Sequence, residues 1–340
     1  MSPETKHLRA RLAGVPAPTL TPTPAIERAI AASVAYLGSE AALRSLDVDP
    51  YWPKWDSPWW HMLLLHELGE ASRIPASAAA AMVASLDRLP LHSFPIQPGD
   101  APPGTDLSRD ISCHCALGSM YQVLAACGVD VDHALPWIVP WFVRYQMADG
   151  GLNCDEHAYL RTDECPSSMV GTVAPFEAML VRGQPDPFLD RGARFLIERT
   201  LSQGSPTVHN AAERTSAPAW RLPCFPRFYY YDVLRGLAAL VRWSTWSGQP
   251  LPREAIAGVV AHLVEQFPDG IVHVERRSYE GRTTVLPGPQ RSPSLRGPTS
   301  SFALLDATSV IGAPSAALTR QWTATRRDLL ALIDAGQLAA

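Results

Sequence analysis

The sequence lacks an excess of basic residues. Its 29 Lys and Arg are opposed by 33 Asp and Glu, which gives a formal net charge of −4. Nucleic-acid binding depends on basic side chains that neutralise phosphates, so this balance argues against a nucleic-acid partner. The sequence also lacks a hydrophobic leader at residues 1–10 and any apolar run of about 18 residues, the length that a membrane span requires. These absences predict a soluble, cytoplasmic protein.

Several motifs of familiar enzyme chemistry are missing as well. The sequence contains no Gly-x-Ser-x-Gly, no phosphate-binding glycine loop and no dinucleotide fingerprint. It has neither Asp-x-Asp-Asp nor Asp-Asp-x-x-Asp. Six cysteines in 340 residues are too few for a disulfide scaffold. Four of them lie close in sequence to His114 or His157, which favours thiol or metal chemistry instead.

Proline and apolar residues are abundant, with 32 prolines and 46% hydrophobic content. A proline inside a helix costs roughly 3 kcal/mol, so its positions mark loops. The prolines gather at 15–24, 90–103, 206–226 and 284–298. Between these loops, apolar residues recur at three- and four-residue spacing, which is typical of helices. We expect helices at 25–37, 57–71, 76–88, 111–127, 133–147, 167–182, 187–201, 228–243, 253–266, 300–311 and 318–336, and one short strand at 271–275.

The expected helices are of two kinds. Some are apolar nearly all round and need cover on every side, as in 59–65, 116–124 and 233–240. Others have one polar face and suit an outer layer, as in 189–198 and 253–261. Their alternation, in units starting near 57, 111, 167, 228 and 300, predicts an all-α fold of stacked helical hairpins. We expect a flexible N-terminal segment at 1–24 and a single domain at 25–340.

Two segments that follow outer helices can be aligned, because 146–153 (Gln-Met-Ala-Asp-Gly-Gly-Leu-Asn) matches 266–273 (Gln-Phe-Pro-Asp-Gly-Ile-Val-His). In each, the Asp-Gly pair predicts a helix stop. The aromatic-rich 141–146 followed by Asp149-Gly-Gly resembles the repeat of squalene-hopene cyclases, although Leu152 stands where that repeat prefers tryptophan. The resemblance is to the toroid superfamily of terpenoid cyclases and protein prenyltransferases. It implies an (α/α) toroid of about five to six hairpins, with long Pro/Gly-rich loops.

In such a toroid the inner helices start at one mouth, around a central cavity. One predicted start holds Asp110 and the Cys-His-Cys of 113–115, and the loop after the next helix holds the Cys-Asp-Glu-His of 154–157. Thiolate and imidazole are ligands that zinc prefers. The candidate metal ligands are Cys113, His114, Cys154 and His157, with Cys115 as a further possibility. The alternative is that the cysteines are small buried apolar residues and the histidines make ordinary hydrogen bonds.

The cluster resembles the zinc ligands of two toroid families. Protein prenyltransferases hold zinc through Asp, Cys and His, and their Asp-x-Cys compares with Asp110-x-x-Cys113, where the spacing is one residue longer. Lanthipeptide cyclases hold zinc through a Cys and an adjacent Cys-His pair, which Cys154 and Cys113-His114 supply in the opposite chain order. Both resemblances imply zinc as the cofactor, and they imply different substrates.

Further candidates lie at the same predicted mouth. A carboxyl group desolvated beside an apolar cavity keeps its proton and can act as a general acid. The candidate catalytic residues are Asp110, Asp155, Glu156 and Tyr230. Aromatic faces and one guanidinium offer contacts for a substrate, and these candidates are Trp55, Trp59, Arg227 and Tyr229. For Arg227 the alternative is an ion pair with Asp232.

These features predict an enzyme that encloses a small, largely apolar, isoprenoid-like molecule in a central cavity. Cyclase, transferase or isomerase chemistry follows by analogy with the toroid families. One alternative is a zinc-dependent peptide-modifying enzyme of the lanthipeptide-cyclase type. The other is a toroid that binds a ligand without catalysis.

Overall fold

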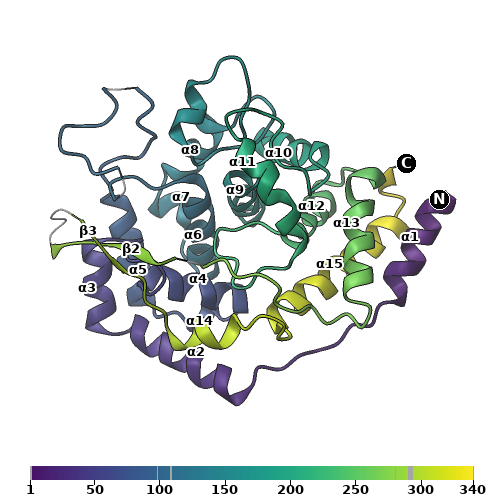
Figure 1. Cartoon of the computed structure of the whole chain (residues 1–340), viewed down its shortest axis with the longest axis horizontal. Coiled ribbons are helices and arrows are strands. Elements are labelled where there is room, and N and C mark those ends of the chain that lie inside the picture. The colour runs from purple at the N-terminus through teal and green to yellow at the C-terminus, as the bar shows by residue number, and fades with distance from the viewer. Residues whose placement is uncertain (1, 98, 108, 280, 290–293, 340) are drawn as a thin grey trace.

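The computed structural model describes residues 2–97, 99–107, 109–279, 281–289 and 294–339 (Figure 1). Most of them are helical, which confirms the predicted all-α class. The helices that match predicted segments are α2 (Pro24–Leu37), α4 (Pro58–Leu68), α5 (Ala76–Asp87), α6 (His114–Ala126), α9 (Met169–Arg182), α10 (Pro187–Glu198), α12 (Val233–Ser247), α13 (Arg253–Gln266), α14 (Ala303–Thr308) and α15 (Ala316–Asp334). The segment expected at 133–147 forms two helices, α7 (Val131–Ala134) and α8 (Ile138–Tyr145).

Other elements were not predicted. They are α1 (Pro3–Gly14), α3 (Glu40–Val48), α11 (Ala211–Ser216) and the 3₁₀ turns η1 (Ala71–Arg73), η2 (Glu156–Leu160) and η3 (Ala217–Arg221). Strands β2 (Thr283–Leu286) and β3 (Leu295–Pro298) pair antiparallel, and β1 (Leu251–Pro252) pairs parallel with β4 (Leu338–Ala339). The strand expected at 271–275 is not formed, since His273 makes only an isolated bridge to Pro314. Among the described residues, no helix has both the length and the apolarity that crossing a membrane requires.

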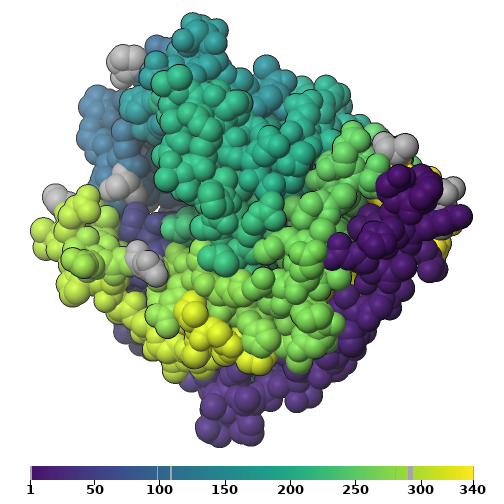
Figure 2. Space-filling view, turned by 45° about the vertical axis from the view of Figure 1, so that its right-hand side comes forward, coloured from purple at the N-terminus to yellow at the C-terminus, as the bar shows by residue number. Residues whose placement is uncertain are grey.

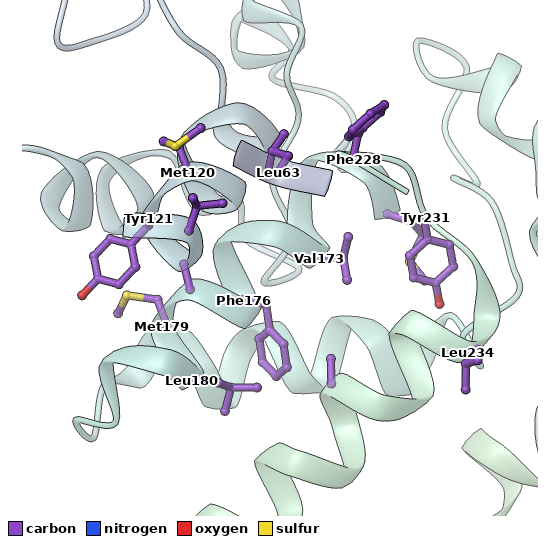
Figure 3. Packing of buried hydrophobic residues seen from close by; sticks show 14 of the residues in the cluster. Leu63, Met120, Tyr121, Val173, Phe176, Met179, Leu180, Phe228, Tyr231 and Leu234 are labelled. Carbon is purple, nitrogen blue, oxygen red and sulfur yellow. The ribbon is translucent and has the colours of Figure 1, made fainter. Parts of the chain in front are cut away.

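Five helices pack in a closed order, and we call them the inner helices. α4 packs against α6, α6 against α9, α9 against α12, α12 against α15, and α15 against α4. Apolar side chains fill the spaces between them, including Leu63 of α4, Met120 of α6 and Phe176 of α9 (Figure 3). The fifth inner helix is α15, not the segment near 300 that the sequence suggested, because α14 is short and packs against α2.

The tightest approach among the inner helices is between α6 and α9. A Cβ atom at Gly118 would lie 2.3 Å from the backbone nitrogen of Pro175. Only glycine permits that contact, and Pro175 removes a backbone N–H at the same level. This approach brings the start of α6 beside the loop that leads into α9, where the candidate site lies.

The N-terminal segment carries helix α1. This helix packs against α13 and α15, with Leu8 and Leu12 buried in the core. Figure 2 shows α1, in purple, lying along the green α13 segment. Residues 3–14, part of the segment expected to be flexible, are therefore a packed helix.

The two aligned sequence segments share one structure. Gly150 and Gly270 both adopt the left-handed conformation, with φ of +90° and +79°. Leu152 N–H donates to Thr172 of α9 at 2.8 Å, and Val272 N–H donates to Thr319 of α15 at 3.0 Å. The carbonyls of Leu152 and Val272 accept from the N-cap residues of these helices, Ser168 and Ser315. The two segments therefore share one local arrangement, in which the turn after α8 or α13 is tied to the start of α9 or α15.

We expect Gly150→Ala to destabilise the fold by about 3 kcal/mol or more, because two penalties add. Its φ is positive, and a Cβ atom there would lie 2.1 Å from the carbonyl oxygen of Arg191. Gly128 has a similar φ of +83° with open space around it, so Gly128→Ala is a matched control that should cost about 1 kcal/mol. Equilibrium unfolding in urea measures both, and equal losses would contradict this account of the turn.

Candidate functional site

Three cysteines from two segments meet at the start of α6. The Sγ atoms of Cys113, Cys115 and Cys154 all lie within 4.8 Å of one another. The Sγ atoms of Cys113 and Cys115 are 3.2 Å apart, and the backbone nitrogen of Cys115 lies 3.5 Å from the Cys154 Sγ atom. Tetrahedral zinc binds thiolates at roughly 2.3 Å, which places sulfurs roughly 3.8 Å apart. This cysteine trio could therefore hold a metal ion.

Local backbone conformation explains which side chains converge. Cys113 is the N-cap residue of α6 and is extended, with φ −117° and ψ 168°. His114 and Cys115 are the first two helical residues, and their side chains point in directions about 100° apart around the helix axis. The Cys115 sulfur therefore reaches that of Cys113, whereas the His114 ring points to Trp141 and Tyr159. Cys154 arrives on the loop that the Gly150 turn and the Leu152–Ser168 bridge hold against α9. The predicted meeting of Cys113 with Cys154 is thus confirmed.

His114 lies beside the trio and is engaged elsewhere. Its Nδ1 accepts a hydrogen bond from the Trp141 indole at 2.7 Å, and its Nε2 lies 2.9 Å from the Tyr159 hydroxyl. An indole nitrogen only donates, so Nδ1 has no proton and Nε2 carries it. Burial lowers the pKa of His114 to about 3, which keeps the ring neutral. Both ring nitrogens are occupied, and Cys115 takes the place that the sequence assigned to His114 as a metal ligand.

His157, the fourth predicted ligand, is exposed on η2 and is not part of the trio. Asp155 caps that turn by accepting from the backbone N–H of His157, and its other oxygen lies 2.8 Å from the His209 ring. Asp110 accepts from the backbone N–H of Asp106 within a turn that precedes α6. Asp110 therefore bonds within its own turn, and Asp155 bonds to the η2 turn and to His209.

The three thiols of the trio differ in how readily they lose a proton. Hydrogen bonds with Cys115 and Cys154 lower the pKa of Cys113 well below that of an ordinary thiol. The same interactions raise the pKa of Cys115 and of Cys154. One thiolate is therefore already favoured in the trio, and binding of a divalent ion would release the remaining protons.

A cavity of about 230 Å³ adjoins the trio, and we call it the thiol cavity. Cys113 and Cys154 line it, together with aromatic and aliphatic side chains. These come from the loop before α4, the start of α4, the end of α5 and the loop before α6, and include Tyr51, Trp59, Leu86, Leu89 and Phe94. Glu156, a predicted catalytic residue, and Trp59, a predicted substrate contact, both line the thiol cavity.

Lys54, which sequence analysis did not single out, also lines the thiol cavity. Its Nζ lies 5.0–5.9 Å from the centroids of five aromatic rings, those of Tyr51, Trp52, Trp55, Trp60 and Tyr229. It also donates to the Tyr229 hydroxyl at 3.0 Å. This contact joins the segment before α4 to the segment before α12, so the starts of these inner helices converge with that of α6.

Two of the remaining predicted residues, Trp55 and Tyr229, belong to these five rings. Trp55 is buried and stacks with Tyr229 at 6.4 Å between centroids, and Tyr230 stacks with Tyr229 at 4.8 Å between centroids. Arg227 makes a two-pronged ion pair with Asp232, at 2.6 and 2.9 Å. The Arg227 guanidinium is therefore paired with Asp232, as in the alternative that the sequence offered. Arg227 also lines a second cavity.

That other cavity, about 360 Å³ in volume, lies among the inner helices, and we call it the central cavity. Each inner helix contributes a polar side chain to its lining, namely Glu67, Gln122, Glu177, Arg235 and Gln321. Arg235 pairs with Glu177 at 2.6 Å, and burial raises the pKa of Glu67 to about 7. The central cavity is therefore lined by several charged and amide side chains, whereas most of the side chains that line the thiol cavity are apolar or aromatic.

The chain was compared with protein-family models, curated proteins and solved structures, and it matches none of them.

Proposed function

We propose that this chain is a zinc enzyme of the toroid type that acts on a small, largely apolar molecule in the thiol cavity. The observation that carries the proposal is that Cys113 and Cys154 belong to the cysteine trio and also line that cavity. Catalytic zinc sites have three protein ligands and one open position, whereas structural sites are closed by four. Among the described residues, the trio is the only cluster of three or more Cys, His, Asp or Glu side chains that could hold a metal ion, and it contains three ligands.

The toroid part of the proposal rests on two features of the fold. The inner helices return from α15 to α4, and the turns at Gly150 and Gly270 tie two outer helices to two inner ones in the same way. Closed order and internal repetition are what a toroid of helical hairpins requires. Functional side chains then collect where inner helices start.

Transferase-type chemistry fits these side chains better than cyclisation through a carbocation. Aromatic faces could stabilise a carbocation, but here five of them surround the ammonium group of Lys54. Zinc, when bound, would supply a Lewis acid or a site for a substrate thiolate. The apolar wall formed by Trp59, Phe94 and Leu86 would exclude water and orient the substrate.

Cobalt substitution tests whether the metal site has an open position. Co²⁺ bound to the trio should show thiolate-to-cobalt charge-transfer absorption and tetrahedral visible bands. Added imidazole or a small thiol should shift the visible bands by replacing a solvent ligand. Bands that no added ligand shifts would indicate a closed structural site and would favour a non-catalytic toroid. A protein that binds no cobalt would contradict the proposal.

A further inference from the structure

The central cavity is separate from the thiol cavity, because the two share no lining residue. Its volume of about 360 Å³ falls in the range of roughly 300–1,000 Å³ that is typical of small-molecule sites. The proposed zinc chemistry makes no use of this space. What the central cavity could bind depends on which polar groups of its lining are already engaged within the protein.

The two buried arginines of this lining are paired with carboxylates. Arg235 contacts Glu177 at 2.6 Å, and Arg227 contacts the buried Asp232 at 2.6 Å. Arg235 also donates to two backbone carbonyls of the loop before α12, at 3.2 and 2.7 Å. Neither guanidinium therefore depends on a ligand for its counter-charge.

Glu67 and Arg320 are the other charged residues of the lining, and they bond to the backbone. The two oxygens of Glu67 accept N–H groups of the loop before α12, at 2.7 and 2.5 Å. Arg320 is exposed and donates to the Leu68 carbonyl at 2.8 Å. A charged ligand would have to compete for partners that the protein already uses, and an unpartnered charge is costly away from bulk water.

Two amide side chains of the lining keep free hydrogen-bonding capacity. The Oε1 atom of Gln321 accepts from the Arg227 guanidinium at 2.6 Å, which leaves its Nε2 group as a donor. The Nε2 group of Gln122 donates to the carbonyls of Gly118 and Ala174 at 3.1 and 3.2 Å, which leaves its Oε1 atom as an acceptor. The amides therefore offer a ligand one donor group and one acceptor.

His66 of α4 adds a neutral imidazole to the same lining. Among the described residues, neither of its ring nitrogens has a hydrogen-bond partner. Burial lowers the pKa of the ring, while the charges of Glu177 and Arg235 act on it in opposite directions. A neutral imidazole offers one donor and one acceptor. These nitrogens and the free amide atoms of Gln321 and Gln122 all have accessible surface, since none is among the buried polar atoms that lack a partner.

We infer that the central cavity binds a neutral molecule of monosaccharide size that carries several hydroxyl groups. The free donors and acceptors lie on three inner helices, α4, α6 and α15, so a matching ligand needs hydrogen-bonding groups on several sides. A hydroxyl group fits either kind of partner, because it both donates and accepts. Apolar side chains of the lining, such as Leu63 and Phe228 (Figure 3), would contact C–H groups of the ligand. This site goes beyond the proposed zinc chemistry and does not depend on it.

Three sugars of nearly equal shape test the inference, namely neutral D-glucose, anionic D-glucuronate and D-glucosamine, which is mostly cationic at neutral pH. Saturation-transfer NMR titrations of the full-length protein measure the three affinities. Wild type should bind D-glucose at least about tenfold more tightly than either charged sugar, because the lining has no spare counter-charge.

His66→Phe should weaken D-glucose binding about threefold to tenfold, since it removes both ring nitrogens and breaks no hydrogen bond among the described residues. Gln321→Met should have a similar effect by removing the Nε2 donor, while Arg227 keeps its pair with Asp232. His92→Phe is the matched control, because His92 is exposed, stacks on Trp137 and lies outside the lining. It should leave the affinity unchanged. Circular dichroism shows which variants are folded.

Three results would overturn the inference: no binding of D-glucose, binding of a charged sugar at least as tight as that of D-glucose, or unchanged affinity in folded His66→Phe and Gln321→Met. Zinc content measured on the same samples separates this inference from the proposed function. Metal-free protein that prefers D-glucose, and loses that preference in the two cavity variants, would support the inference while the zinc proposal fails.

Discussion

Cys115→Ser is expected to lower the metal affinity of the protein at least about 100-fold, so that the purified variant carries almost no zinc. A serine hydroxyl stays protonated at neutral pH and is a poor zinc ligand, which leaves two sulfurs where three are needed. Cys113→Ser and Cys154→Ser should have the same effect, because all three sulfurs lie within 4.8 Å of one another. Elemental analysis of the purified variants measures the zinc content per chain.

Cys165→Ser and His157→Ala are the matched controls. Both residues follow Cys154 closely in sequence, and neither belongs to the trio. Both variants should keep the wild-type zinc content. A wild-type zinc content in Cys115→Ser, together with loss of zinc in His157→Ala, would contradict zinc binding by the trio. It would instead support the ligand set that the sequence predicted, which includes His157.

His114→Ala should cost about 3–5 kcal/mol of stability while leaving the zinc content unchanged. His114 is completely buried, and its removal leaves a cavity and deprives the Trp141 indole of its acceptor. His133, exposed on α7, provides the control, and His133→Ala should change stability by less than about 0.5 kcal/mol. Unfolding in urea and zinc analysis of the same samples distinguish a structural histidine from a metal ligand. Replacing a metal ligand would remove zinc from the protein, whereas replacing a structural histidine would lower only the stability.

The neutral ring of His114 also predicts a pH dependence. Its folded pKa, about 3, lies below the ordinary value of 6.5, so protons bind more tightly in the unfolded chain. The stability from this group is present above about pH 6.5 and is lost as the pH falls toward 3. Between pH 7.5 and pH 5, wild type should lose about 2 kcal/mol that His114→Gln does not lose. Parallel pH profiles for the two proteins would show that the ring is not held neutral.

The helical class could be predicted because proline and apolar spacing are local signals. The segment 253–266 matches α13 at both ends, and 76–88 matches α5 to within one residue. α1 was missed because its polar composition gives little periodicity, and its contacts with α13 and α15 come from distant parts of the chain. The fifth inner helix was misplaced for a related reason, since α14 and α15 both have helical patterns and only packing shows which one joins the ring.

The structure brings together some of the predicted site residues and separates others. The Cys-His-Cys order places candidate metal ligands at the start of α6. Choosing Cys115 over His114 requires the directions of their side chains, since the Cys115 sulfur meets that of Cys113 and the His114 ring meets Trp141. The two hydrogen bonds of His114 come from Trp141 and Tyr159, which no spacing rule places there. Lys54 had a weak signal, as the one charged residue in the aromatic segment 51–55. Its cavity partners come from distant segments, so its role required the fold.

X-ray absorption at the zinc edge of the purified, full-length protein tests the central claim most directly. The spectrum should fit three sulfur neighbours at about 2.3 Å and one oxygen neighbour at about 2.0 Å, without the multiple scattering of an imidazole ring. A fit with one or two imidazole nitrogens would place histidine in the metal shell. That result, or four sulfur neighbours, would contradict a three-cysteine site that opens onto the thiol cavity.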